Sequence, residues 1–202
     1  MVFVFDLDDT ICDTNGYSEK YISDFFVKNN LPFVKVANET RFAEAKFSWN
    51  METANEWYKT YGDEMMLHFP CHPYAVEAIN ALHDAGHKIV IATARATDWH
   101  TKPEEITFAW LEKIGLKYDK IYIGRVDKEN VCKEENADVF IDDDLKITER
   151  VSQVFSEMKN KFVFLSTTDY NKNLSTPAGV KRMKNFEEFA KMFNVKLSKE
   201  KQ

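Results

Sequence analysis

Residues 1–10 read MVFVFDLDDT: four apolar residues, Val2 to Phe5, are followed at once by Asp6, Asp8 and Asp9. A short apolar run that stops at acids is typical of a buried strand. Three carboxylates within four residues repel one another unless a cation or hydrogen bonds compensate. Carboxylate oxygens are ligands for hard divalent cations, so the pattern favours a metal site. A solvated acidic turn would have the same local sequence. The residues at the ends of the other strands are therefore needed to distinguish a metal site from such a turn.

Later parts of the chain repeat the apolar run, with helical patterns between the repeats. Further strands are expected at 88–92, 120–123, 138–141 and 162–165. Amphipathic patterns predict helices at 74–85, up to Gly115, along a face that runs from Ile147 to Met158, and from Phe186 to Phe193. This alternation predicts an α/β fold, with a Rossmann-like parallel sheet of about five strands and helices on both faces. In such sheets, ligands bind beyond the carboxyl ends of the strands.

One interval, residues 14–72, interrupts the alternation. It begins with an amphipathic helical pattern that includes Tyr21 and Phe25 and continues into a stretch rich in aromatic residues. We expect a small helical cap inserted after strand one, with residues 1–13 and 73–202 forming the core. An insertion there lies over the carboxyl edge of the sheet, where a substrate lid belongs.

The fourth expected strand also ends in acids, Asp142, Asp143 and Asp144. If the first and fourth strands are neighbours, six carboxylates meet at one edge, and a divalent cation is needed to relieve their repulsion. The second strand ends at Thr93, whose hydroxyl and the following backbone N–H groups could hold a phosphate oxygen. Arg95 either adds charge near that phosphate or pairs with a surface acid.

Phosphoryl transfer needs a cation beside the equatorial phosphate oxygens, and the candidates are Lys128 and Lys133. The expected helix before the fourth strand starts near Lys128, at the carboxyl edge. Lys133 is displaced by about 7.5 Å along such a helix. Lys128 is therefore favoured, although an irregular helix would reverse the choice.

Together the strand ends resemble the four motifs of the haloacid dehalogenase-like phosphatase superfamily: Asp6-x-Asp8-x-Thr10, then Thr93, Lys128 and Asp142-Asp143. The resemblance covers roughly residues 1–13 and 73–195. Asp9 stands where many members have Gly, but other phosphatase members carry Asp there.

The resemblance implies a magnesium-dependent phosphatase with an aspartyl-phosphate intermediate. Asp6 would attack phosphorus, and Asp8 would protonate the leaving oxygen and then activate water. Superfamily members that act on carbon–halogen bonds typically lack an acid at the position of Asp8. Asp6, the backbone carbonyl of Asp8 and Asp142 would hold Mg²⁺, and Asp143 would orient a water on the metal. The phosphate-binding set would be Thr93, Ala94 and Lys128.

For the substrate, the chain is similar to the 5'(3')-deoxyribonucleotidase-like group of that superfamily. Three features support this similarity: the position of the cap, the short interval from the lysine to the acidic pair, and the segments 167–171, 180–183 and 185–189. A (deoxy)nucleoside monophosphate is then the expected substrate. Aromatic side chains stack on nucleobases, so one of the cap aromatics would contact it, or they form only the core of the cap. Residues considered for substrate contact are Thr10, Arg95, Phe25, Phe26, Trp49 and Trp57.

The alternatives are a phosphatase for sugar phosphates or other metabolites, a mutase that transfers phosphoryl groups, and, least favoured, a non-catalytic binding module. The last is disfavoured because every motif position keeps its functional group.

Composition narrows the partners. The 202 residues carry a net charge of −6, with lysine and arginine scattered, so polymeric nucleic acid is not an expected partner. We expect a small phosphorylated metabolite instead. Three cysteines without metal-ligand spacing, no signal peptide and no membrane-length apolar stretch predict a cytoplasmic protein without a membrane partner. Oligomeric state is not predicted.

Overall fold

Six strands form one parallel sheet in the computed structural model, which describes residues 1–197 except 33, 38–39, 41–42, 98–99, 157 and 159. The strands are β1 (Val2–Phe5), β2 (Lys88–Thr93), β3 (Lys120–Ile123), β4 (Val139–Asp142), β5 (Phe162–Ser166) and β6 (Val180–Met183). Their order across the sheet is β3-β2-β1-β4-β5-β6, and every neighbouring pair is parallel. The predicted α/β class is confirmed.

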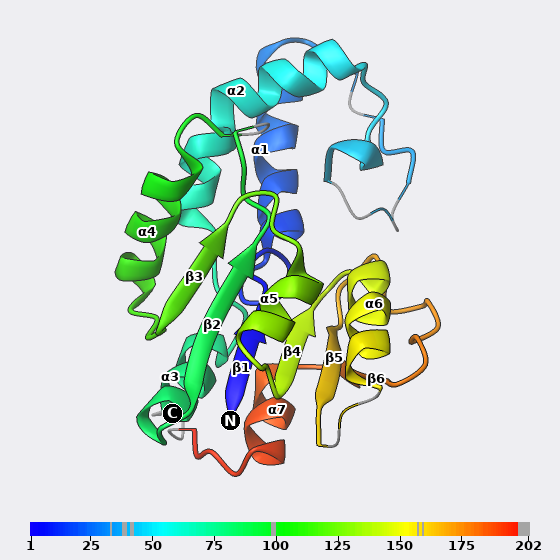
Figure 1. Cartoon of the computed structure of the whole chain (residues 1–202). Helices are drawn as coiled ribbons and strands as arrows, with labels where there is room; N and C mark the ends of the chain where they lie inside the picture. The colour runs from blue at the N-terminus through cyan, green and yellow to red at the C-terminus, as the bar shows by residue number, and fades with distance from the viewer. Residues whose placement is uncertain are drawn as a thin grey trace.

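Helices cover both faces of this sheet (Figure 1). They are α1 (Thr14–Lys28), η1, a 3-10 turn (Ala43–Lys46), α2 (Met51–His68), α3 (Ala75–Asp84), α4 (Pro103–Ile114), α5 (Lys128–Glu134), α6 (Leu145–Phe155) and α7 (Phe186–Met192). Successive strand residues point to opposite faces, so Phe3 and Phe5 pack with α3, α4 and α7, whereas Val4 packs with α5 and α6. No helix among the residues described is long and apolar enough to cross a membrane.

Two details differ from the expected elements. The sheet has a sixth strand, β6, which was expected only as part of a family-like tail. At the sheet edge, Val180 and Arg182 are partly buried, Lys181 is exposed and only Met183 is buried, so the strand lacks a continuous apolar run. Helix α6 ends at Phe155, and Met158 lies beyond it with 43% of its surface exposed.

Helices α1 and α2 lie beyond the carboxyl ends of the strands (Figure 1). Helix α2 packs against α4 of the core. The Trp110 indole N–H donates to the Phe69 carbonyl at 3.0 Å, and the Thr101 backbone N–H donates to the Asp63 carboxylate at 3.0 Å. The helical segment is therefore fastened to the core at several points near its return to α3.

At the amino end of the sheet, Glu135 gathers three donors. Its carboxylate accepts from Lys88, Lys120 and Tyr122, each at 2.6 Å. The Glu135 side chain is only 5% exposed, while both lysines are about half exposed. This cluster ties the starts of β2 and β3 to the end of α5, on the side of the sheet away from the acidic strand ends.

Candidate active site

The order of strands reverses between β1 and β4, and the acidic strand ends lie at this point. In open α/β sheets, this crevice is where ligands bind. Asp6 directly follows β1, and its backbone N–H donates to Ile141 in β4 at 3.0 Å. Asp142 is the last residue of β4. The topology thus brings the two acidic clusters side by side.

Lys128 lies between the two clusters. Its ammonium group donates to Asp6 Oδ1 at 2.7 Å and to Asp142 Oδ2 at 2.6 Å. All three residues are buried, with exposed fractions of 4%, 4% and 0% for Asp6, Lys128 and Asp142. Lys133, the other candidate, is exposed five positions later, at the end of the same short helix.

The electrostatics of Asp6 call for more positive charge than Lys128 supplies. Burial, together with the neighbouring charges of Asp142 and Asp8, raises the pKa of Asp6 to about 7 against the opposing effect of Lys128. A carboxylate that must attack phosphorus works in its ionised form. A divalent cation beside it would favour that form.

Asp6, Asp142 and Asp143 fit such a cation. Each offers one oxygen, and these atoms lie within 4.8 Å of one another. Oxygen donors of this kind suit Mg²⁺. Oδ2 of Asp143 accepts from the Tyr170 hydroxyl at 2.6 Å, which restrains the orientation of the carboxylate.

The side chain of Asp144 caps a helix. Its Oδ1 accepts from the backbone N–H groups of Lys146 and Ile147 at 2.7 and 3.0 Å, so it caps α6. Its own backbone N–H donates to Asp142 Oδ1 at 2.8 Å. Asp144 therefore orients Asp142 through the backbone, while its side chain is used by the helix.

Thr93 ends β2 at the same edge, and Ala94 follows it at an exposed position of the next loop. The Thr93 hydroxyl is fully buried and has no hydrogen-bond partner among the described residues. A buried polar atom without a partner needs an explanation, and a phosphate oxygen would supply one.

Asp8 is held by Arg95, the residue whose role the sequence left open. The guanidinium donates to both carboxylate oxygens, from Nε at 3.0 Å and from Nη2 at 2.9 Å. The Thr14 hydroxyl donates to Oδ1 at 2.7 Å. Burial opposes ionisation of Asp8, but the charge and hydrogen bonds of Arg95 prevail and lower its pKa to about 2.

Asp9 adopts the left-handed conformation, with φ of 54°. Glycine adopts this conformation without strain, and aspartate tolerates it better than most other residues. The conformation therefore explains why either residue can occupy this position. The Asp9 carboxylate accepts from the Asn15 backbone at 2.9 Å and from the Asn15 side chain. The chain thereby turns away from the site into α1.

The aromatic residues of the segment 14–72, the expected cap, pack on one another. Phe25, Phe26 and Trp57 are at most 3% exposed, and Trp49 is partly buried among them. Trp49 lies 5.2 Å from Phe26 and 5.6 Å from Trp57 between ring centroids. None of the four lines either of the two hollows described next.

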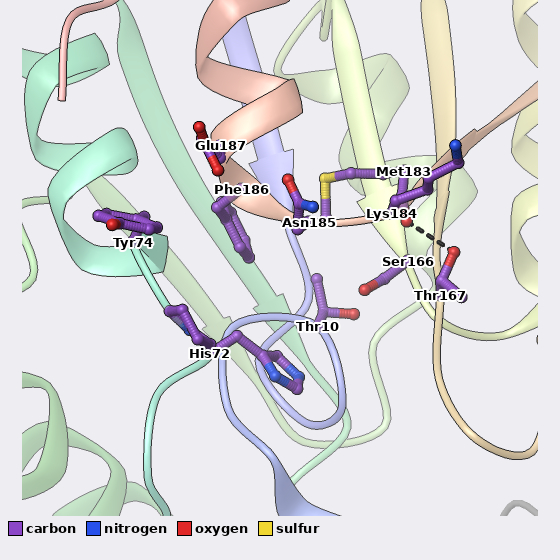
Figure 2. A pocket seen from close by; sticks show the side chains of 11 residues that line it. Thr10, His72, Tyr74, Ser166, Thr167, Met183, Lys184, Asn185, Phe186 and Glu187 are labelled. Carbon is purple, nitrogen blue, oxygen red and sulfur yellow. Dashed lines mark hydrogen bonds between the residues drawn. The ribbon is translucent and has the colours of Figure 1, made fainter.

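Two hollows flank the loop that follows β1. The first, of about 280 Å³, is lined by residues that include Thr10, His72 and Phe186, which converge in Figure 2. The Thr10 hydroxyl is fully buried and has no hydrogen-bond partner among the residues described. The second, of about 320 Å³, lies between α1 and the loop 167–172. Its lining is mainly polar and charged, and includes Asp9, Asp13, Asn15, Glu19, Lys46 and Thr168.

Sequence reasoning gave no role to Tyr170 and Thr14, and it did not identify the partner of Arg95. Tyr170 was noted only within a family-like tail, and its contact with Asp143 spans 27 positions. Thr14 lies six residues after Asp8, and no local pattern indicates that its hydroxyl turns back.

Known proteins resemble this chain in fold more than in sequence. No protein-family model matches it. A Bacillus cereus protein named "Putative nucleotidase" is 28% identical over 184 residues, covering 88% of this chain and 92% of that protein.

Several solved structures superimpose over nearly the whole chain. A "predicted phosphatase" from Clostridium acetobutylicum is 19% identical, with a TM-score of 0.61 and coverage of 96% of this chain and 97% of that one. CbbY from Rhodobacter sphaeroides, solved as a mutant with xylulose-(1,5)bisphosphate, is 13% identical, with a TM-score of 0.59 and coverages of 93% and 95%. A haloacid dehalogenase-like family hydrolase from Streptococcus pneumoniae is 13% identical, with a TM-score of 0.59 and coverages of 95% and 97%. The chain therefore has the fold of haloacid dehalogenase-like hydrolases.

Proposed function

We propose that the protein is a magnesium-dependent phosphomonoester hydrolase that works through an aspartyl-phosphate on Asp6. The observation that carries this proposal is the buried group of Asp6, Lys128 and Asp142 at the switch point of the sheet. Two acids and one lysine, packed within hydrogen-bond distance where ligands bind, are costly to keep unless they serve chemistry. The fold shared with phosphatases agrees with this assignment.

In the first step, an Asp6 oxygen forms a bond to phosphorus while the bond from phosphorus to the leaving oxygen breaks. Arg95 holds Asp8 ionised in the free protein, so the proton enters with the monoanionic form of the phosphate ester and Asp8 passes it to that leaving oxygen. In the second step, Asp8 takes a proton from water, whose oxygen attacks phosphorus and releases phosphate and free Asp6. Lys128, Thr93 and the backbone at Ala94 would hold the equatorial phosphate oxygens.

Mg²⁺ would be held by Asp6, Asp142 and the backbone carbonyl of Asp8, with Asp143 beside it. When bound, it would neutralise charge on the phosphate oxygens and favour ionised Asp6. Tyr170 would keep the carboxylate of Asp143 in place through the hydrogen bond to Oδ2.

For the substrate we propose a nucleoside monophosphate, because the Bacillus cereus relative that spans most of this chain is named as a nucleotidase. A sugar phosphate is the second candidate. The hollow between α1 and the loop 167–172 has a mainly polar lining, which suits hydroxyl groups, while the cap aromatics pack on one another. A cytoplasmic location and a small phosphorylated metabolite as partner remain part of this proposal.

The test is release of phosphate by the purified protein, with Mg²⁺ and then with EDTA. We expect Mg²⁺-dependent hydrolysis of p-nitrophenyl phosphate that Asp6→Asn abolishes. Asp24→Asn, at an exposed position on α1, is the matched control and should keep full activity. No turnover of any ester by the unaltered protein would overturn the proposal. A panel of deoxy- and ribonucleoside monophosphates beside sugar phosphates then separates the two substrate classes.

A further inference from the structure

The ion pair between Arg95 and Asp8 joins residues 87 positions apart in the sequence, and Arg95 is buried against two aromatic rings. The Arg95 side chain is only 2% exposed. Its guanidinium lies 5.0 Å from the ring centroid of Trp110 and 5.7 Å from that of Phe69. Aromatic faces favour a nearby guanidinium, so the two rings help to hold Arg95 in place.

Both oxygens of Asp8 are engaged. Oδ2 accepts from Arg95 Nε, and Oδ1 accepts from Arg95 Nη2 and from Thr14. A carboxylate has about four lone-pair positions in total. The Cys12 thiol adds a longer contact to Oδ1 at 3.8 Å, so Oδ1 carries three donors and Oδ2 carries one. Oδ2 is therefore the Asp8 oxygen that can still form a hydrogen bond with a further group, such as a substrate oxygen.

We propose that Arg95 is a positioning residue that sets Asp8 so that Oδ2 faces the leaving oxygen of the substrate. The inference rests on the proposed function, because it assigns Arg95 a task in the step that breaks the ester bond. Arg95 need not touch the substrate for this task. Two of its nitrogens are used on Asp8, and Nη1 is buried with no hydrogen-bond partner among the residues described.

The fork of the guanidinium is the essential feature. A lysine at position 95 would keep the charge but would offer a single donor point, so it could not hold both oxygens of Asp8 in one plane. Displacing a catalytic group by about 1 Å costs roughly 100-fold in rate. Proton donation matters most for a leaving group that departs poorly, such as an alkoxide. It matters least for p-nitrophenolate, which leaves without help.

The experiment compares kcat/KM for p-nitrophenyl phosphate and for an alkyl phosphate in Arg95→Lys. This ratio reports steps up to departure of the leaving group, so the later attack of water does not enter it. We expect a loss of about 100-fold with the alkyl ester and less than about tenfold with the aryl ester. Arg150→Lys, an exposed arginine on α6, is the matched control and should change neither value.

A double-mutant cycle with Asp8→Asn separates positioning from folding or direct substrate binding. If Arg95 acts through Asp8, adding Arg95→Lys to Asp8→Asn should cause no further loss of aryl phosphatase activity. Equal losses for both esters, or the same loss with and without Asp8, would overturn the inference. If the unaltered protein hydrolyses neither ester, the proposed function itself has failed, whereas activity without this leaving-group dependence refutes only the role of Arg95.

Discussion

Lys128→Met removes the only cation that contacts the carboxylates of both Asp6 and Asp142 among the residues described. Methionine keeps most of the apolar stem, so the change isolates the ammonium group. Two hydrogen bonds to charged groups are lost, at 2.7 and 2.6 Å, each worth about 1.5–3 kcal/mol. Breaking a buried ion pair by removing one partner costs about 3–5 kcal/mol. Protonation of Asp6, whose pKa already lies at about 7, limits the penalty. We therefore expect a loss of about 3 kcal/mol in the free energy of unfolding.

The assay is urea unfolding at pH 8, first with EDTA and then with Mg²⁺. Lys133→Met is the matched control, because this lysine is exposed on the same helix, and it should shift stability by less than about 0.5 kcal/mol. Mg²⁺ binds the native state and stabilises it by mass action. It should restore more stability to Lys128→Met than to the unaltered protein, because no ammonium then repels it from these oxygens. Equal unfolding midpoints for the two lysine variants in EDTA, or equal gains from Mg²⁺ in Lys128→Met and the unaltered protein, would refute this reasoning.

Two further predictions concern residues away from the phosphate site. Hydrogen bonds from two lysines and a tyrosine lower the pKa of Glu135 from 4.5 to about 2, so its contribution to stability is present above pH 4.5 and is lost as the pH falls to 2. Because both lysines are half exposed, Glu135→Gln should lower the free energy of unfolding by about 1 kcal/mol at pH 7, with the difference vanishing near pH 2 in urea titrations. Trp57→Phe should cost about 1–3 kcal/mol of stability and leave KM for a nucleoside monophosphate unchanged, because Trp57 is buried in the cap. A raised KM with full stability would instead indicate that Trp57 contacts the base.

The positions of the acidic strand ends could be predicted from local sequence. Asp6 and Asp142 each follow a short apolar run, and runs of this kind mark buried parallel strands whatever the rest of the fold. Once both strands lie in one sheet, their carboxyl ends share an edge by geometry. For this reason the meeting of Asp6 and Asp142 could be predicted without any structure, whereas Lys128 was only favoured over Lys133 by its place at the start of a helix.

Side-chain pairing over long separations could not be predicted in the same way. Arg95 follows a strand end, but whether its guanidinium turns to phosphate or to an acid depends on where Trp110 and Phe69 place their rings. Those rings come from a core helix and from the return of the cap. Strand β6 was missed for a different reason, because an edge strand is half exposed and carries charges where a central strand is apolar.

The two outer strands of the sheet also bear on how copies of this protein meet. An outer strand has backbone groups on one side that no neighbour takes up, and it can pair with another chain. Both outer strands here carry cations: Lys120 begins β3, and Lys181 and Arg182 lie within β6. Charged side chains on such strands, lysine above all, discourage edge-to-edge pairing. A protein that is acidic as a whole thus has basic residues on both outer strands of its sheet, a pattern that discourages pairing between copies.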